Sequence, residues 1–415
     1  MLPSVVRRRK VVAMVDDCVM VTGLGVVCAL GANLEDSWTR LLKGDDGAAP
    51  VSVFDGSGCR CQQAAEVPAD WLECKSSNGR KFSRASGLAI PAARQALASA
   101  GLGSAEKNAI ALSVSTTAGA MQWGEDFLRG LIFDRRGGLL RRIARQQPQQ
   151  QLLDLQEALQ MRAGITHVIG NACASGANAI GHASDLLLTG QAEVALAGGY
   201  EALSELLFLG FDCLRASSNT RCRPFDQDRD GLMLGEGAAF LVLETGAHAK
   251  RRGAKSLARL AGYGHSTDLT HLTQPAPDGK SLVSALRSAS RRARIEPAEI
   301  GYVNAHGTGT PLNDTAEAAA FAEFFGAALG KTRVSSTKAA IGHTLGAAGA
   351  IEAAFTVQSL TRQQLPPQIA TTDPMPEMAA SLVQARGETA RNLRYAASVN
   401  LGFGGSNAAL IFAPQ

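Results

Sequence analysis

Aromatic residues are scarce in this chain, and its charge is nearly balanced. Only 5% of the 415 residues are Phe, Trp or Tyr, and 41 basic residues against 37 acidic ones give a net charge of +4. Proteins that bind nucleic acid without a dedicated motif need a strongly basic face or aromatic platforms on which bases stack. The composition therefore argues against a DNA- or RNA-binding protein.

Long apolar runs are also missing. The most apolar stretch, residues 203–211, is interrupted by Glu205 and is too short to cross a bilayer. Residues 1–10 contain four consecutive basic residues but lack the apolar segment of a secretion signal. We therefore expect residues 1–18 to be a flexible basic leader, the protein to span no membrane, and its location to be the cytoplasm.

Cysteine usage fits that compartment. The chain has eight cysteines, which we expect to be reduced thiols in a cytosolic protein with a large core. Cys59, Cys61 and Cys74 resemble half of a zinc site, but no second paired motif completes it. We predict no metal site.

Cys173 is the most informative residue that is present. It stands where the apolar run 166–169 gives way to a helix of small residues that contains Ser175, Gly176 and Gly181. Free amides and the dipole at a helix N-terminus favour an anion, so this position is expected to lower the thiol pKa and produce a nucleophilic thiolate. The alternative is an inert core cysteine, which is the commoner fate of a cysteine among alanines and glycines.

Two distant histidines favour the nucleophile. His306 follows the apolar residues 300–303, and His343 precedes a second small-residue helix that contains Gly346 and Gly349. One cysteine with two histidines from separate segments is typical of a nucleophilic site assembled by the fold. Either histidine alone could equally be a structural residue.

These segments, together with Arg223-Pro224-Phe225-Asp226 and Gly402-Phe403-Gly404-Gly405, resemble a known family. Over residues 19–412 the chain is similar to the elongating beta-ketoacyl-[acyl-carrier-protein] synthases, which are 3-oxoacyl-[acyl-carrier-protein] synthases with a Cys-His-His triad. The resemblance implies an acyltransferase that performs a decarboxylating Claisen condensation between an acyl group held on Cys173 and a malonyl carrier-protein thioester, in fatty-acid or type II polyketide or polyene synthesis.

The implied fold is an α/β, thiolase-like, five-layered α/β/α/β/α sandwich of two pseudo-symmetric halves. The sequence agrees, because strand-length apolar runs alternate with helix-compatible segments at 84–100, 177–188 and 314–325. We expect an N-terminal half with the nucleophile at 19–255 and a C-terminal half with both histidines at 256–415.

The resemblance also implies roles for individual residues. The backbone amides of Cys173 and Phe403 would bind the oxyanion, and Phe403 would gate the site. His306 and His343 would stabilise the enolate as neutral donors, supported by Lys338, whose buried ammonium needs a carboxylate partner that is by motif Glu352. Asp314 and Glu317 are expected to cap the helix after His306 rather than to act in catalysis.

No cofactor is expected beyond the phosphopantetheine arm that carries the substrates. The His306-to-Thr310 segment lacks the Gly-Lys-Ser/Thr ending of a P-loop, so it indicates no nucleotide. By motif Thr273, Thr308 and Thr310 would hydrogen-bond the arm, although threonines in such loops often serve only as caps.

The chain departs from the family between residues 134 and 165, where an arginine-rich run precedes a glutamine-rich one. In the family this region helps to form the dimer interface and the wall of the acyl pocket. Exposed arginines could dock an acidic acyl carrier protein, with a solvated basic face as the alternative. The predicted docking residues are Arg135, Arg136, Arg141, Arg142 and Arg215.

The implied assembly is a homodimer or a heterodimer with a chain-length-factor-like paralogue. An alternative function is that of the non-catalytic, chain-length-factor-like partner subunit itself. Such subunits lack the nucleophile, which this chain retains. A degradative thiolase is disfavoured because residues 402–407 contain no second cysteine.

Overall fold

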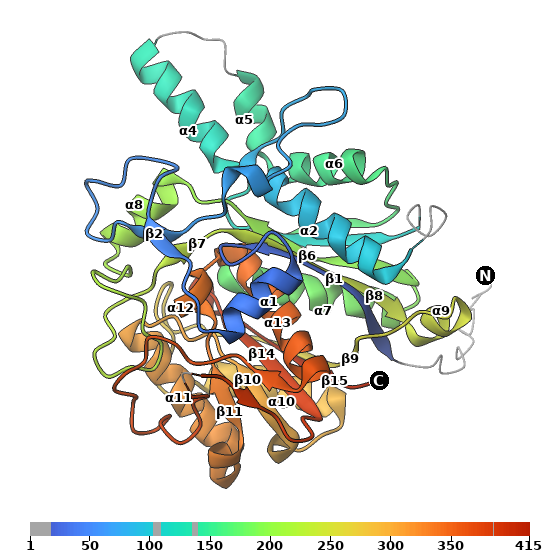
Figure 1. The fold of residues 1–415 in the computed structure, drawn as a ribbon, viewed down its shortest axis with the longest axis vertical. Helices are drawn as coiled ribbons and strands as arrows, with labels where there is room; N and C mark the ends of the chain where they lie inside the picture. The colour runs from blue at the N-terminus through green and yellow to red at the C-terminus, as the bar shows by residue number, and fades with distance from the viewer. Residues whose placement is uncertain (1–17, 103–108, 135–139, 385) are drawn as a thin grey trace, which may run out of the picture.

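The computed structural model describes residues 18–102, 109–134, 140–384 and 386–415. All but the last residue of the predicted leader lies outside these ranges. Ten strands form one sheet in the order β11-β10-β14-β15-β9-β1-β8-β6-β4-β5 (Figure 1). Their bounds are β1 Val19–Cys28, β4 Ala111–Ser115, β5 Thr166–Ile169, β6 Val194–Glu201, β8 Gly237–Thr245, β9 Ala258–Thr267, β10 Ile300–Asn304, β11 Arg333–Ser335, β14 Tyr395–Leu401 and β15 Ser406–Ala413.

The sheet consists of two sets of five strands with the same pattern. In the first set β4 is parallel to β5 and β6, whereas β8 and β1 continue antiparallel. In the second set β10 is parallel to β11 and β14, whereas β15 and β9 continue antiparallel. The sets meet where β1 and β9 pair over only three residues. The predicted pair of similar halves is confirmed, and the predicted boundary after residue 255 lies in the loop before β9.

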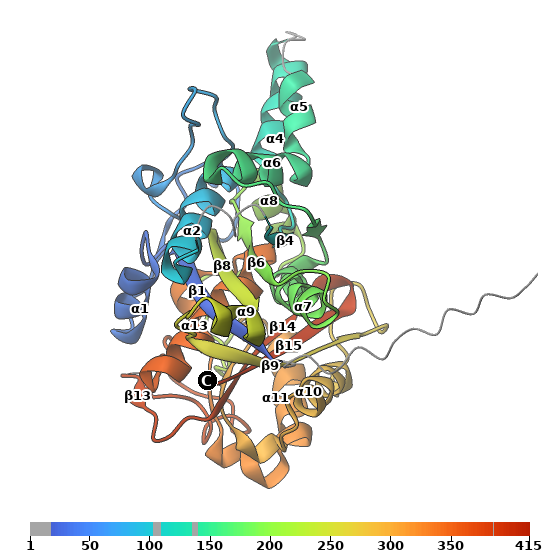
Figure 2. The same cartoon turned by 90° about the vertical axis from the view of Figure 1, so that its right-hand side faces the viewer.

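Helices complete five layers (Figures 1 and 2). The central layer holds α7 (Ser175–Leu188) and α13 (Ala348–Arg362), which contact each other and strands of both sets. One outer layer holds α2 (Arg84–Ala100) with α6 (Pro148–Leu159), and the other holds α10 (Lys280–Ala293) with α11 (Pro311–Phe325). The thiolase-like sandwich predicted from the sequence is therefore the observed fold.

Glycines let the two central helices approach closely. A Cβ added at Gly176 would lie 2.6 Å from the backbone nitrogen of Ala350, and one at Gly349 would lie 2.4 Å from that of Ala177. Any larger residue would push α7 and α13 apart. Because Cys173 precedes α7 and His343 precedes α13, this packing brings the two chemical groups together.

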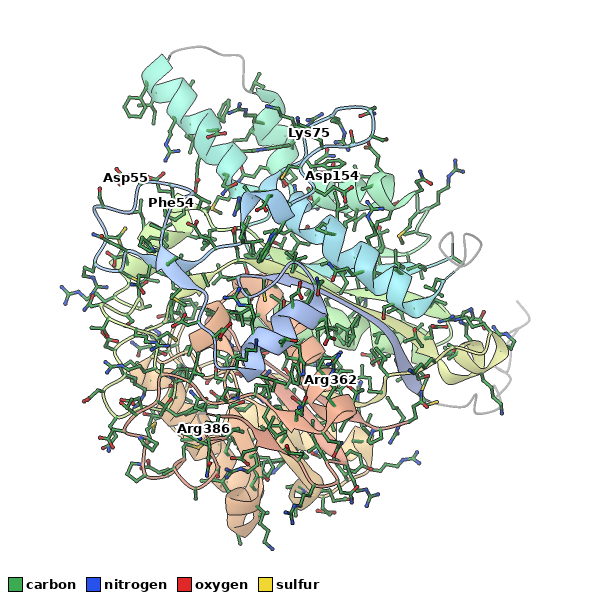
Figure 3. All side chains as sticks on the ribbon, viewed as in Figure 1. Phe54, Asp55, Lys75, Asp154, Arg362 and Arg386 are labelled. Atoms are coloured by element: carbon green, nitrogen blue, oxygen red, sulfur yellow. The ribbon has the colours of Figure 1, made fainter. Side chains whose placement is uncertain are left out.

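The segment that departs from the family contributes the second helix of a helical hairpin and one packed helix. Helices α4 (Met121–Arg129) and α5 (Leu140–Gln146) project from the body at the top of Figure 1, joined at α4 by the π-helical turn Gly130–Asp134. Helix α6 is anchored on α2 by the buried Asp154, which is labelled in Figure 3. Its carboxylate accepts a hydrogen bond from Ser86 Oγ at 2.7 Å.

The remaining elements are each at most nine residues long. They are α1 Leu34–Leu42, α8 Glu205–Cys213, α9 Gly246–Arg251, α12 Lys338–Ile341, β2 Ala48–Pro50, β3 Gln63–Ala65, β7 Leu234–Gly235, β12 Gln364–Leu365 and β13 Glu388–Thr389, with short 3-10 turns between them. No helix within the described ranges has the length and apolarity needed to cross a membrane.

Candidate active site

Cys173 lies in a tight turn between strand and helix. The strand β5 ends at Ile169, and Cys173 is the middle residue of the single turn Ala172–Ala174 that leads into α7. Ala172 adopts the left-handed region with φ 55°. Ser175 closes the turn, because its Oγ accepts from the Asn171 amide at 2.8 Å and donates to the Ala172 carbonyl at 2.6 Å. The thiol is thereby held at the start of α7 as predicted.

The pKa of the Cys173 thiol differs from the prediction. Burial raises it to about 11, although the Lys338 ammonium and the Phe403 backbone amide both lower it. The side chain is almost fully enclosed, so the cost of desolvating a thiolate exceeds the stabilisation that a helix N-terminus provides. The sulfur is therefore a neutral thiol near pH 7 and must lose its proton when it attacks.

Two histidines face this thiol. His306 follows β10 and His343 follows α12, and ligating atoms of Cys173, His306 and His343 all lie within 4.8 Å of one another. The imidazole rings are 5.2 Å apart and nearly perpendicular. Burial and the Lys338 charge hold the pKa of each histidine well below its usual range, with His343 further lowering that of His306. Both imidazoles are therefore neutral.

One hydrogen bond fixes a tautomer. The Leu345 amide donates to Nδ1 of His343 at 3.3 Å, so the proton of the neutral ring is on Nε2. Nδ1 of His306 is buried and has no hydrogen-bond partner among the described residues. The His306 ring thus retains hydrogen-bonding capacity that the described residues do not use, which suits a group that binds a substrate oxygen.

Lys338 and Glu352 form an ion pair in which each side chain is about 1% exposed. Asn400 Nδ2 donates to the second carboxylate oxygen of Glu352 at 2.6 Å. The pair is the one that the motif implied, and the Lys338 charge lowers the pKa values of Cys173 and both histidines. Its supporting role in catalysis stays a prediction.

Asp314 and Glu317 do not cap helix α11, contrary to the expectation. The carboxylate of Glu317 accepts from the amides of His306 and Gly307, each at 2.7 Å. That of Asp314 accepts from the amide of Phe225 at 2.7 Å. Both are buried, so they point back into the protein and hold the loop that carries His306 instead of satisfying the helix's own first turn.

Glu201 is a functional candidate that sequence reasoning missed. It is buried at the end of β6 and accepts hydrogen bonds from the amides of Thr117, Ala118 and Gly346 at 2.7, 2.9 and 2.9 Å. It therefore ties the loop after His343 to the loop after β4. An acidic residue that ends an apolar strand was the available signal.

Phe403 stands over the thiol. Its backbone amide lowers the pKa of the Cys173 thiol, and its ring stacks on Phe211 of α8 with centroids 5.7 Å apart. Gly402 permits this approach, because a Cβ there would lie 3.2 Å from the backbone nitrogens of Cys173 and Ala174. Oxyanion binding by this amide and gating by the ring both stay predictions.

A cavity of about 280 Å³ opens onto Cys173, His306, His343 and Phe403. Thr273, Thr308 and Thr310 also line it, and the hydroxyls of Thr308 and Thr310 are 2.8 Å apart. Thr310 immediately precedes α11, but its side chain makes no capping bond, so capping does not account for it. The positions suit the predicted contacts with a pantetheine arm, and those contacts stay a prediction.

Two of the five predicted docking arginines, Arg142 and Arg215, have side chains that the structure describes. Arg215 is exposed and lines the cavity, whereas Arg142 on α5 pairs with Asp126 at 2.8 Å. Arg135 and Arg136 lie outside the described residues, and the side chain of Arg141 is not described.

Within the described ranges, Cys59, Cys61 and Cys74 do not form a cluster with metal-ligand spacing.

Comparisons with known proteins agree with this geometry. Residues 16–249 match the family described as beta-ketoacyl synthase, N-terminal domain, and residues 257–372 match the beta-ketoacyl synthase C-terminal domain. The 3-oxoacyl-[acyl-carrier-protein] synthase 2 of Vibrio cholerae serotype O1 is 36% identical over 417 residues, covering 95% of this chain and 98% of the relative.

Two solved structures are similar over nearly the whole chain. The ishigamide ketosynthase/chain length factor has a TM-score of 0.89 at 30% identity, covering 97% of this chain and 100% of that one. A ketosynthase bound to a hexaketide, in complex with its type II polyketide-synthase acyl-carrier protein, has a TM-score of 0.87 at 25% identity. The match covers 96% of this chain and 99% of that one. From the sequence matches on both halves, the Cys-His-His cluster and the fold, the chain belongs to the beta-ketoacyl synthase family.

Proposed function

We propose that this protein is a 3-oxoacyl-[acyl-carrier-protein] synthase that condenses an acyl group held on Cys173 with a malonyl carrier-protein thioester. The observation that carries the proposal is the buried thiol within 4.8 Å of two neutral histidines at one cavity. As a member of the beta-ketoacyl synthase family, the protein is an acyltransferase.

The first half-reaction is acyl transfer to the thiol. Cys173 sulfur attacks the thioester carbonyl and gives its proton to a neutral imidazole, because its pKa of about 11 keeps the proton on sulfur until then. The backbone amides of Cys173 and Phe403 stabilise the tetrahedral oxyanion. The bond from the carbonyl carbon to the carrier's sulfur then breaks, and the carrier leaves as a thiol with that proton.

The second half-reaction is decarboxylation and carbon–carbon bond formation. When the malonyl carboxylate leaves as carbon dioxide, its bonding electrons form an enolate, whose oxygen accepts hydrogen bonds from His306 and His343. The enolate carbon attacks the acyl-Cys173 carbonyl, and collapse of the intermediate expels the sulfur. Because the pKa of Cys173 is so high, the released thiolate takes up a proton from solvent water, which restores the resting thiol.

Neutral histidines suit these reaction steps. A cationic imidazole would hold the malonyl carboxylate as an ion pair and favour the ground state, whereas a neutral N–H gains most when charge develops on the enolate oxygen. The Lys338 charge lowers the pKa of both rings and so helps to keep them neutral. This effect is a physical reason for a lysine in the site.

We propose further that Thr273, Thr308 and Thr310 hold the phosphopantetheine arm and that no other cofactor is needed. The natural partner is then an acyl carrier protein, as the names of the relatives suggest. A homodimer, or a heterodimer with a chain-length-factor-like paralogue, and a cytoplasmic location complete the proposal. The similarity to a ketosynthase/chain length factor supports the heterodimer, and the similarity to synthase 2 enzymes supports the homodimer.

Mass spectrometry of the intact protein and of its Cys173 peptide, after incubation with a panel of acyl carrier-protein thioesters, tests the function. We expect one acyl group per chain on Cys173 and none in a Cys173→Ala variant. The chain lengths that react identify the starter group. Absence of acylation by every thioester would instead favour the non-catalytic partner subunit.

A further inference from the structure

Glu201 is a fully buried carboxylate that does not line the catalytic cavity. Each of its oxygens accepts two hydrogen bonds. Oε1 accepts from Thr116 Oγ1 and from the Ala118 amide, both at 2.9 Å. Oε2 accepts from the amides of Thr117 and Gly346 at 2.7 and 2.9 Å. An ionised carboxylate offers about four acceptor positions, so these donors occupy all of them.

The Gly346 amide belongs to the turn that fixes the His343 ring. The turn Leu345–Ala347 begins two residues after His343, and the Leu345 amide donates to Nδ1 of that ring at 3.3 Å. Two consecutive amides of one turn therefore bind two different groups, the imidazole and the Glu201 carboxylate. A movement of the turn that breaks the bond to Glu201 also moves the neighbouring donor away from Nδ1.

The turn is strained at Leu345, which adopts the left-handed region with φ 47°. This region is unfavourable for a bulky residue, which stays there only when its surroundings hold it. Gly346 makes two of the contacts that hold it, because its amide binds Glu201 and its carbonyl accepts from Ser115 Oγ at 2.9 Å. The bond to Glu201 is the stronger of the two, since a charged partner roughly doubles the strength of a hydrogen bond.

The carboxylate also joins this turn to the loop after β4. A Cβ added at Gly346 would lie 2.6 Å from the Thr117 backbone nitrogen and 2.8 Å from Oε2 of Glu201. The charge of Glu201 raises the pKa of the Cys173 thiol and so opposes formation of the thiolate. Its contribution to the reaction therefore lies in the backbone that it holds and not in activation of the nucleophile.

We propose that Glu201 is a positioning residue for decarboxylation, because it holds the Leu345–Ala347 turn in the conformation that keeps the proton of His343 on Nε2. The inference rests on the proposed function, in which that N–H donates to the enolate oxygen. Without the carboxylate the turn relaxes, the Leu345 amide leaves Nδ1, and the ring populates both tautomers. Acyl transfer to Cys173 needs an imidazole that accepts a proton, which His343 with Nδ1 occupied does not supply, so this step does not depend on the turn.

The test compares Glu201→Gln with a matched control, Glu244→Gln. Glutamine keeps the shape of glutamate but replaces one acceptor oxygen by an amide NH2 group, which cannot accept from a backbone amide. Glu244 is also fully buried but does not line the cavity, and its hydrogen-bond partners are Thr22, His248 and Arg252. The control thus reports what loss of a buried carboxylate does to the protein as a whole.

We expect Glu201→Gln to lower the kcat for decarboxylation of malonyl carrier protein about 10- to 100-fold, the ratio for loss of a hydrogen bond to a charged group, at unchanged KM. Acylation of Cys173 should not fall, since removal of the negative charge lowers the pKa of the thiol. Glu244→Gln should keep both rates within about threefold of the parent. Ser115→Ala removes a neutral hydrogen bond from the same turn and should slow decarboxylation about two- to tenfold.

Nitrogen-15 spectra of the histidine rings supply a readout that general destabilisation would not move. The His343 signals are assigned by their absence from His343→Ala. The parent and Glu244→Gln should show the proton of His343 on Nε2, whereas Glu201→Gln should show both tautomers.

An unchanged His343 tautomer in Glu201→Gln, a decarboxylation rate within about threefold of the parent, or equal loss of acylation and decarboxylation would each overturn the proposal. If Glu201→Gln does not fold, a parental decarboxylation rate in Ser115→Ala overturns it. A parent protein that neither accepts acyl groups nor decarboxylates malonyl carrier protein would instead refute the proposed function. The tautomer measurement would still decide the role of Glu201, so the two failures are distinguishable.

Discussion

Replacement of Lys338 by Met should destabilise the protein, because it leaves the buried carboxylate of Glu352 without its partner. Each side chain of the Lys338–Glu352 pair is about 1% exposed, and removing one member of such a pair leaves an uncompensated charge. The expected loss in the free energy of unfolding is about 3–5 kcal/mol near pH 8. Methionine approximates the length of the lysine stem, so little of this loss comes from a cavity.

The loss should depend on pH with a definite sign. Burial raises the pKa of Glu352 above 4.5, and Lys338 is the largest opposing influence, so the variant raises that pKa further. A carboxyl whose folded pKa exceeds its unfolded value stabilises the fold only while it is protonated. The parent loses stability in the same way until its own folded pKa for Glu352 is reached. Stability relative to the parent should therefore fall as pH rises from the parent's folded pKa to the higher folded pKa of the variant, by up to about 1.4 kcal/mol per pH unit.

Urea denaturation of the variant and the parent at pH 5 and pH 8 measures the loss in the free energy of unfolding. Lys331→Met is the matched control, because Lys331 is exposed and its replacement should change stability by less than about 0.5 kcal/mol. The double variant Lys338→Met/Glu352→Leu should recover most of the loss, since an apolar pair can replace a buried ion pair. Equal losses at both pH values, or a loss under about 1 kcal/mol, would refute the reasoning.

Three further predictions concern the site. The rate of alkylation of Cys173 by iodoacetamide, followed on its peptide by mass spectrometry, should rise about tenfold per pH unit from pH 7 to 10, because the thiol pKa is about 11; a plateau below pH 9 would contradict this. His306→Ala and His343→Ala should each slow malonyl decarboxylation about 10²- to 10³-fold while Cys173 still accepts acyl groups; a parental rate would show that the histidine has another role. Arg215→Gln should raise the KM for carrier protein a few-fold at low salt and leave it unchanged at about 0.5 M salt, whereas a salt-independent effect would exclude a charge contact.

The reacting groups could be predicted from the sequence because their local signals are strong. Small residues after Cys173 and His343 predict tightly packed helices, and glycine at 176 and 349 is required for the observed contact between α7 and α13. Helix α2 occupies the predicted residues 84–100. These features depend on neighbours in the chain, so one sequence is sufficient to find them.

Properties that depend on distant residues were not predictable in the same way. The pKa of Cys173 is set mainly by burial, which is a consequence of the whole fold, and a helix N-terminus alone suggested the opposite shift. Asp314 and Glu317 have the spacing of helix caps but bind the amides of Phe225, His306 and Gly307 instead. Glu201 accepts hydrogen bonds from Thr116 and Gly346, which lie 85 and 145 positions away from it in the chain.

The measurement that tests the central claim most directly is a single-turnover condensation. The protein is first acylated on Cys173, freed of excess thioester and mixed with malonyl carrier protein labelled in its carboxylate. The account predicts one 3-oxoacyl product, two carbons longer than the acyl group, for each labelled carbon dioxide released, with Cys173 returned to the free thiol. Release of carbon dioxide while the acyl group stays on Cys173, or the same product from Cys173→Ala, would contradict it.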